Sequence, residues 1–267
     1  MHDAIGHTQS FRDLLDPARA AALHATLSLA GHSPKHGDPL PPFWHQIYFW
    51  DAQPPAKLGP DGHPSVGSGL IPDLGLPVRM WAGGTLAFDA PVVLGKPAEK
   101  HSTVENVVQK VGRTGPLGFV TLRHEIWQEN QLCVTEHQDI VYRMLQTDTN
   151  QPVPKQAPTD ERIACKTSFN STQLFRYSAL TFNGHRIHYD LEYARQTERY
   201  SGLVVHGPLL AQQLILLAQE KLGGLSTFAF RATSPLIHDE EAELCWNDGR
   251  LWVRGPSGRL CMEATAT

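Results

Sequence analysis

The spacing of hydrophobic residues predicts one surface helix and one buried helix. Between residues 10 and 30, Ala and Leu recur three and four positions apart, which is the spacing of a surface helix. Residues 209–222, LLAQQLILLAQEKL, are apolar nearly all round and stand between a Gly-Pro pair and a Gly-Gly pair. Pro at the first helical position and Gly after the last are typical helix ends. A helix that lacks a polar face is expected to be buried.

The other predicted elements are strands, which form one set in each half of the chain. Their sequences are rich in β-branched and aromatic residues, and turn residues bound them. Strands are expected at residues 79–95, 102–112, 118–128, 132–145, 225–237, 241–248, 250–255 and 259–267. Two strand sets and one long buried helix predict an α+β fold built from a duplicated unit. The first copy would be degenerate, because it has no comparable helix.

A polar segment, residues 146–172, separates the two strand sets. It contains three prolines before Cys165, and this composition is typical of a linker. The expected division is therefore an N-terminal half with a leading helix at residues 1–145, a linker at 146–172, and a C-terminal half at 173–267.

Composition and charge predict a soluble cytoplasmic protein. The net charge of the 267 residues is −4, so no basic surplus indicates binding to nucleic acid or to an acidic membrane surface. The N-terminus lacks the pattern of a signal peptide, and the longest apolar stretch, residues 209–217, is too short to span a bilayer. The four cysteines have no CxxC spacing, so we expect small buried hydrophobic residues in a reducing compartment.

The candidate chemistry lies at Asn183, His185 and His188, which are polar residues in an apolar setting just before the predicted buried helix. Imidazole is the natural general base near neutral pH. Adding water to a carbon–carbon double bond needs a base for the water, a group that fixes the water, and donors for the charge that builds on a thioester oxygen. The alternative is that these are ordinary hydrogen-bonded residues at a turn.

The segment RYSALTFNGHRIHYD, followed by YSGLVVHGPL, resembles the hot-dog hydratases of the MaoC-like group. The closest resemblance is to the type 2 hydroxyacyl-thioester dehydratases and the mesaconyl-CoA and itaconyl-CoA hydratases. Matching phrases in the first half are DGHP, LPVRMWAGG, GRTGPLGFVTLRHEI and EHQDIVYR. The resemblance implies a double hot-dog fold, in which two antiparallel sheets each curl round a helix. The helix from Pro208 would fill the second half.

The resemblance also implies roles for individual residues. His188 stands at the place of the family's catalytic histidine. Asn183 stands where most members have a catalytic aspartate, and an amide can position water or substrate but cannot act as a base. His185 stands where the wider family commonly has Asn, so the acid–base work rests on His188 alone or is shared with His185. Gly207 matches the position whose backbone N–H binds the thioester oxygen, as a helix N-terminus favours.

Further residues are candidates for contacts with the substrate. Arg186 could bind a substrate carboxylate or a CoA phosphate, or it could pair with Asp190 or Glu192. Arg176 and Tyr177 either contact the substrate or brace the segment. His206, next to the buried helix, is expected to pack or cap rather than react. Other candidates for the CoA phosphates are Lys110, Arg113 and Arg231.

Together these features predict a hydro-lyase that acts on a short-chain enoyl-CoA. The resemblance favours a branched dicarboxylic acyl group, with mesaconyl-CoA or itaconyl-CoA giving citramalyl-CoA. We expect no metal and no cofactor other than CoA as part of the substrate, and a homodimer is left open. The alternatives are a 3-hydroxyacyl-carrier-protein dehydratase of fatty-acid synthesis, a hot-dog thioesterase, and a non-catalytic acyl-CoA-binding protein.

Overall fold

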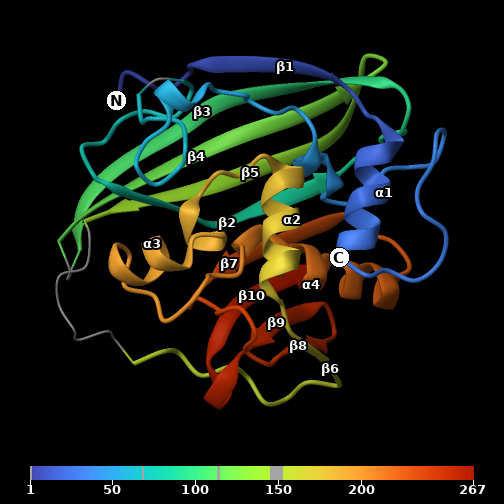
Figure 1. Ribbon diagram of the computed structural model, residues 1–267. Helices are drawn as coiled ribbons and strands as arrows, with labels where there is room; N and C mark the ends of the chain where they lie inside the picture. The colour runs from blue at the N-terminus through green and yellow to red at the C-terminus, as the bar shows by residue number, and fades with distance from the viewer. Residues whose placement is uncertain (1, 68, 113–114, 145–152) are drawn as a thin grey trace.

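The computed structural model describes residues 2–67, 69–112, 115–144 and 153–267 (Figure 1). Within these ranges, ten strands form one sheet, and every pair of neighbours is antiparallel. The order across the sheet is β1 (Thr8–Leu14), β3 (Pro97–Gly112), β4 (Gly115–Gln128), β5 (Gln131–Arg143), β2 (Val78–Phe88), β7 (Thr227–Ala232), β10 (Leu260–Ala266), β9 (Arg250–Arg254), β8 (Ala242–Asn247) and β6 (Ile163–Thr167). The pairing of β2 with β7 joins the strands of the first half to those of the second.

Alternating burial explains why these segments form strands. In β4, every second residue from Gly118 to Gln128 is buried, so one face of the strand packs inward and the other faces outward. β4 continues into β5 through Glu129 and Asn130, which both have left-handed φ angles, of 51° and 64°. Two such residues form the tight turn that suits the twist of a hairpin. The predicted strands of both halves are thus confirmed as β2 to β5 and β7 to β10.

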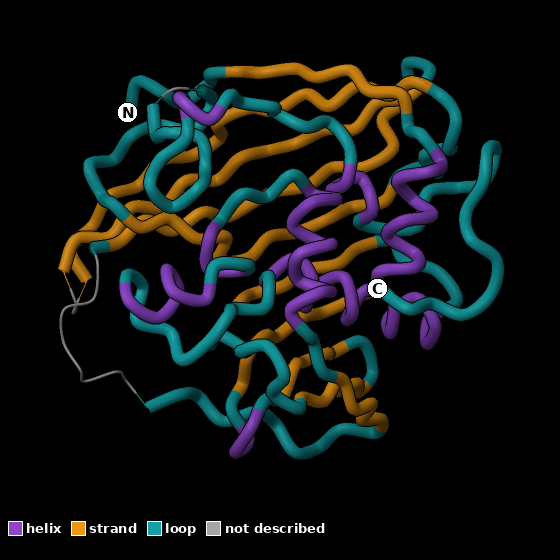
Figure 2. Tube along the Cα trace, viewed as in Figure 1, coloured by secondary structure: helices purple, strands orange, loops and turns teal. Residues whose placement is uncertain are grey.

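The helices lie against one side of the sheet (Figure 2). Their bounds are α1 (Pro17–Thr26), α2 (Ser171–Thr181), α3 (Leu191–Gln196) and α4 (Gly207–Leu222), with 3₁₀ turns η1 (Trp44–Ile47), η2 (Pro55–Lys57), η3 (Arg186–His188) and η4 (Pro256–Gly258). The predicted buried helix is confirmed as α4, which packs against the strands of the second half and against β2. Its end at Gly223 is left-handed, with φ 75°. This large sheet with a few helices confirms the predicted α+β class.

The predicted helix at residues 10–30 is wrong at its start. Residues 8–14 alternate between exposed and half-buried positions and pair with β3 as β1. The helix begins at Pro17, where the Asp16 side chain accepts a hydrogen bond of 2.9 Å from the Ala18 N–H. The pairing with β3 is a long-range contact, and it overrides the helical spacing of Ala and Leu.

The predicted linker at residues 146–172 needs a correction as well. Residues 145–152 lie outside the described part of the chain, but residues 163–167 form β6, which pairs with β8 at the edge of the sheet. Asn170 then caps α2, a helix that the hydrophobic spacing did not predict. The structured part of the second half therefore begins before residue 173. The division of the chain into two separate halves stays a prediction.

The cysteines are buried with one exception. Cys133, Cys245 and Cys261 are buried as expected, whereas Cys165 is exposed. Cys165 lies on β6, and an edge strand has a neighbour on one side only, which corrects the expectation for this residue. Among the helices of the described chain, none is long and apolar enough to cross a membrane.

Candidate active site

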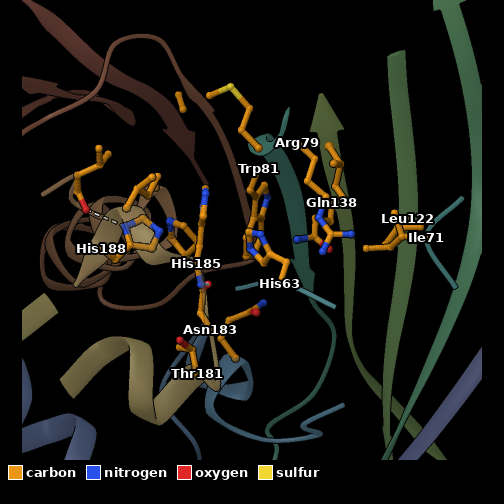
Figure 3. A pocket seen from close by; sticks show the side chains of 18 of the residues that line it. His63, Ile71, Arg79, Trp81, Leu122, Gln138, Thr181, Asn183, His185 and His188 are labelled. Atoms are coloured by element: carbon orange, nitrogen blue, oxygen red, sulfur yellow. Dashed lines mark hydrogen bonds between the residues drawn. The ribbon is translucent and has the colours of Figure 1, made fainter. Parts of the chain in front are cut away.

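A cavity of about 480 Å³ lies between the sheet and the segments around α2 and α4. Ligand sites for small molecules commonly have this size. Its lining includes strand residues from the first half of the chain together with Asn183, His185, His188 and Gly207 from the second half. The fold thus brings the predicted catalytic segment against the inner face of the first strand set (Figure 3).

His188 lies on the turn η3 and is held there as a neutral imidazole. Its Nδ1–H donates a 2.7 Å hydrogen bond to the Val204 carbonyl, so Nε2 carries the lone pair. Burial, with the nearby His206 and His185, lowers the pKa of His188 well below its ordinary value of 6.5. A buried neutral imidazole with one free nitrogen is suited to take a proton from water.

His206 stands at the N-cap position of α4, where its side chain makes no capping hydrogen bond and packs against His188 instead. The two rings are stacked with their centroids 3.6 Å apart. A 2.8 Å hydrogen bond joins the His206 Nε2 to the Ser178 hydroxyl, and burial lowers the pKa of His206 to about 3. Tyr177 is buried beside the same ring, at 5.0 Å between centroids, and it lines the cavity. This packing fixes the plane of the His188 ring.

Gly207 opens α4 and lines the cavity. Its backbone N–H has no acceptor among the backbone hydrogen bonds of the described residues. A Cβ atom built at Gly207 would lie 3.8 Å from its nearest neighbour, the Trp81 carbonyl oxygen. The space beside this backbone is thus empty of protein atoms, and glycine adds no side chain to fill it. The glycine therefore keeps a helix N-terminal N–H open to a ligand in the cavity.

Asn183 shapes the turn that carries the histidines. Its Oδ1 accepts a 3.0 Å hydrogen bond from the His185 N–H, which is the geometry of an Asx turn. The His185 ring in turn donates from Nε2 to the Glu198 carboxylate at 3.2 Å, and only 8% and 5% of these two side chains are exposed. Glu198 lines the cavity, and the sequence had not indicated it.

A second carboxylate–histidine pair comes from the first half of the chain. The His63 Nδ1 lies 3.0 Å from the Asp61 Oδ2, and the His63 ring is 4.4 Å from the His185 ring. Burial raises the pKa of Asp61, but the hydrogen bond and charge of His63 outweigh it and bring it to about 2. Burial lowers the pKa of His63 to about 4. Asp61 and His63 belong to the DGHP phrase, and its Asp-x-His spacing was the only sequence signal that could have indicated this pair.

Two glycines let these loops approach each other. Gly62 has φ +89°, and a Cβ built there would lie 2.0 Å from the Gly184 carbonyl oxygen. A Cβ at Gly184 would lie 2.4 Å from the Gly62 oxygen. The Arg186 N–H donates to the Asp61 carbonyl at 2.9 Å across the same contact. His63 can therefore lie beside His185 only because Gly62 and Gly184 have no side chains.

Asp61, His63 and His185 place donor atoms of metal-ligand type within 4.8 Å of one another. Asp61 and His63 bond each other, and His185 bonds Glu198. The cluster therefore consists of two carboxylate–imidazole pairs, and the hydrogen bond within each pair explains why these groups lie close together.

Two of the predicted substrate contacts lie away from the cavity lining. Arg186 forms an ion pair of 2.7 Å with Asp190 and lies over the Tyr193 ring at 4.3 Å, so the structure shows the ion-pair alternative. Arg176 is exposed on α2 and does not line the cavity, so its position does not support a substrate contact. Tyr177 alone of this group reaches the cavity.

The predicted candidates for CoA phosphates also lie elsewhere. Lys110 packs over the Phe119 ring at 4.4 Å, Arg231 is exposed on β7, and neither lines the cavity. Arg113 lies outside the described residues. The cations that do line the cavity are Arg79, Lys100 and Arg143, none of which sequence reasoning had selected.

The fold and site define a hot-dog protein that acts on thioesters, and sequence comparison identifies the family. Residues 43–238 match the family described as hydroxyacyl-thioester dehydratase type 2. The chain is 41% identical over 267 residues to the mesaconyl-C(4)-CoA hydratase of Chloroflexus aurantiacus, covering 98% of this chain and 95% of the relative. It is 28% identical to the mitochondrial hydroxyacyl-thioester dehydratase type 2 of Schizosaccharomyces pombe, covering 91% of each. The chain belongs to this family and is a hydro-lyase.

Solved structures share the fold at low sequence identity. A MaoC-like dehydratase from Phytophthora capsici superposes with a TM-score of 0.71 at 12% identity, covering 98% of this chain and 95% of that one. A Mycobacterium tuberculosis protein described as having a double hotdog fold gives 0.60 at 12% identity, covering 98% and 95%. These likenesses confirm the double hot-dog fold that the sequence motifs implied.

Proposed function

We propose that the protein hydrates a short, branched, dicarboxylic enoyl-CoA, mesaconyl-CoA or itaconyl-CoA, to citramalyl-CoA, or catalyses the reverse dehydration. One observation carries the chemical part: His188 is a buried neutral imidazole with a free Nε2, in the same cavity as the open N–H of Gly207. The relative named mesaconyl-C(4)-CoA hydratase, at 41% identity, supports the acyl group.

The mechanism assigns each proton to a named atom. His188 Nε2 takes a proton from water while the water oxygen bonds to the β-carbon of the acyl group. In mesaconyl-CoA, whose double bond is conjugated with the thioester, the electrons of the double bond move towards the thioester oxygen, and the Gly207 N–H stabilises the charge there. The imidazolium of His188 then gives its proton to the α-carbon, so one water molecule is added in total. Itaconyl-CoA has its double bond between the β- and γ-carbons, so the same base must first move a proton from the α-carbon to the γ-carbon, which gives the conjugated ester. In the reverse direction the same groups exchange roles.

Asn183 and His185 have supporting roles in this proposal. The Asn183 Oδ1 is engaged with the His185 N–H, so its amide N–H₂ is the part left to hold the attacking water. The His185 Nε2 lies 3.2 Å from the Glu198 carboxylate, and the His185 ring lies 5.5 Å from the His188 ring between centroids. We assign to this pair the stabilisation of the proton that His188 has taken up.

Turnover of three thioesters tests the proposal. Mesaconyl-CoA, itaconyl-CoA and crotonyl-CoA are each offered to the enzyme, and loss of the double bond and release of free thiol are followed in parallel. We expect hydration of at least one dicarboxylic ester without thiol release. Thiol release would indicate a thioesterase, and no reaction with any ester would favour an acyl-CoA-binding protein.

A carrier-protein dehydratase of fatty-acid synthesis is the weaker alternative. It needs a long apolar tunnel for its acyl chain. On the strands of the first half, the cavity wall mixes apolar side chains such as Leu122 and Ile140 with polar ones, among them Lys100, His124 and Gln138. Burying an alkyl chain against these groups would cost free energy. Comparing crotonyl-CoA with decenoyl-CoA checks this, and we expect the shorter ester to react faster.

The Glu198 carboxylate is expected to contribute through His185. Glu198→Gln should lower kcat by roughly 10-fold, with KM little changed, because an amide cannot stabilise a positive imidazole ring as a carboxylate does. Glu192→Gln is the matched control, since Glu192 is exposed on α3. Steady-state kinetics with crotonyl-CoA measure both variants. Equal kcat for the two would remove His185 from the proton transfer.

The pH profile of kcat/KM is expected to lack the fall near pH 6.5 that protonation of an ordinary histidine base would cause. Because the pKa of His188 is lowered well below 6.5, the base stays unprotonated, and kcat/KM should hold constant as pH falls from 8 to 6.5. A fall in kcat/KM centred at or above pH 6.5 would contradict this.

The stability of the fold is expected to fall below pH 6.5. His63 and His206 have pKa values lowered to about 4 and about 3 in the folded protein, so below pH 6.5 the unfolded chain binds more protons than the folded one. Circular dichroism at each pH therefore accompanies the kinetics.

A further inference from the structure

The cavity contains positive charge that the proposed chemistry does not use. Arg79, Lys100 and Arg143 line it, and none of the three forms an ion pair with any residue that the structure describes. Two carboxylates also line it, Glu198 and Asp51. Glu198 is bonded to His185, and Asp51 accepts a 2.5 Å hydrogen bond from the Gln53 side chain. An anionic group entering the cavity would therefore find unpaired cations.

Arg79 is the cation next to the histidines. It lies on β2, and its Nη2 donates a 2.7 Å hydrogen bond to the carbonyl of Pro64, the residue that follows His63. Burial lowers the pKa of His63 most, and the charge of Arg79 contributes to the same shift. In Figure 3, Arg79 points into the region beyond His63 and Trp81 as seen from His188. The Arg79 guanidinium also hydrogen-bonds the Tyr142 side chain, and the N–H groups that then remain can donate to a ligand.

Gln138 offers further donors at the same place. Figure 3 shows the Gln138 side chain beside Arg79. Its Oε1 lies 3.1 Å from the His124 Nε2, and the His124 Nδ1 lies 2.7 Å from the Ser102 hydroxyl. Burial lowers the pKa of His124 to about 3, so the ring is neutral and donates one N–H, to Gln138. The Gln138 amide N–H₂ then has no acceptor among the described side chains.

We propose that Arg79, with the Gln138 amide, binds a carboxylate that the acyl group carries beside its reacting double bond. A carboxylate accepts hydrogen bonds only, and the Arg79 guanidinium and the Gln138 amide N–H₂ both donate. A guanidinium can bind both oxygens of one carboxylate, which fixes orientation as well as charge. The inference rests on the proposed hydratase function and adds the residue that selects a dicarboxylic acyl group.

Two acyl groups that differ by one carboxylate test this proposal. Mesaconyl-CoA, esterified so that its free carboxylate is on the β-carbon, has this carboxylate trans to the thioester, where crotonyl-CoA has its methyl group, and a methyl group in place of the β-hydrogen. Arg79→Gln should lower kcat/KM for mesaconyl-CoA roughly 100-fold and change that for crotonyl-CoA less than about threefold. Arg79→Lys should lie between the wild type and Arg79→Gln, because it keeps the charge and loses the two-pronged bond. Arg231→Gln, an exposed arginine on the next strand, is the matched control.

Pantetheine thioesters of the same acids separate the acyl carboxylate from the phosphates of CoA. Equal losses for mesaconyl-CoA and crotonyl-CoA that disappear with the pantetheine esters would assign Arg79 to a CoA phosphate and overturn the proposal. Unchanged kinetics of Arg79→Gln with every ester would also overturn it. A selective loss for mesaconyl-CoA that persists with mesaconyl-pantetheine supports it.

A binding measurement keeps this test separate from the hydratase function. Calorimetric titration compares butyryl-CoA with methylsuccinyl-CoA that carries its carboxylate on the β-carbon, and neither ester can be hydrated. We expect the wild type to prefer methylsuccinyl-CoA and Arg79→Gln to lose that preference. If no thioester is hydrated but the preference is seen, the hydratase proposal fails and the carboxylate site stands. Equal affinities in the wild type reject the carboxylate site.

Discussion

Replacing His188 by Asn is expected to lower kcat/KM roughly 10³-fold or more, since a general base commonly contributes 10²–10⁴-fold. Asparagine keeps an N–H near the position of Nδ1, so it can still donate to the Val204 carbonyl. It has no counterpart of Nε2, the nitrogen that takes the proton from water. The loss should therefore appear in kcat. His188→Ala removes both nitrogens and should lose at least as much.

The control for this prediction is a histidine outside the cavity. His32 is exposed in the loop after α1, and His32→Ala should leave the kinetics unchanged. Thermal unfolding of each variant shows whether the fold persists. A folded His188→Asn variant with near wild-type turnover would remove His188 from its assigned role, and His185 would then be the next candidate for the base.

Replacing Gly62 by Ala is expected to damage both stability and activity. The backbone there has φ +89°, and the new Cβ would lie 2.0 Å from the Gly184 carbonyl oxygen, so one of the two loops must move. We expect the free energy of unfolding to fall by about 2–4 kcal/mol. We also expect kcat/KM to fall about 100-fold, because displacing either loop moves the catalytic groups relative to one another.

Gly6 provides a matched control for the left-handed backbone. It has the same φ, +89°, and nothing lies within 4 Å of a Cβ built there. Gly6→Ala should therefore show only the cost of the backbone conformation, about 1 kcal/mol, and normal kinetics. Chemical denaturation and assays with crotonyl-CoA measure both variants. If the two substitutions have equal effects on stability and on kcat/KM, the contact between the loops does not position the site.

Sequence patterns predicted the elements whose signals are local. The uniform apolarity of residues 209–222 indicated α4, and the strand patterns at residues 118–128 and 132–145, with turn residues between them, indicated β4 and β5. The motif from Asn183 to His188 indicated the turn with the base, and Gly207 indicated the helix N-terminus opposite it. Each of these signals lies within a few residues of the structure that it specifies, so a single sequence is enough to recognise it.

Patterns failed where long-range pairing decides the structure. The helical spacing of Ala and Leu was extended back to residue 10, yet residues 8–14 form β1 because β3 supplies a partner strand. Residues 163–167 look like linker and form β6 because β8 is beside them. The propensity of a short segment is worth less than the backbone hydrogen bonds and burial gained at a sheet edge.

The sequence by itself determined the class of fold, and it singled out His188 and Gly207, which line the same cavity. Only the tertiary structure decided what surrounds them. The pairing of β2 with β7 sets the two halves side by side, and the contact between Gly62 and Gly184 places His63 against His185. The two members of each of these contacts are distant along the chain, and spacing along a sequence carries no record of such contacts.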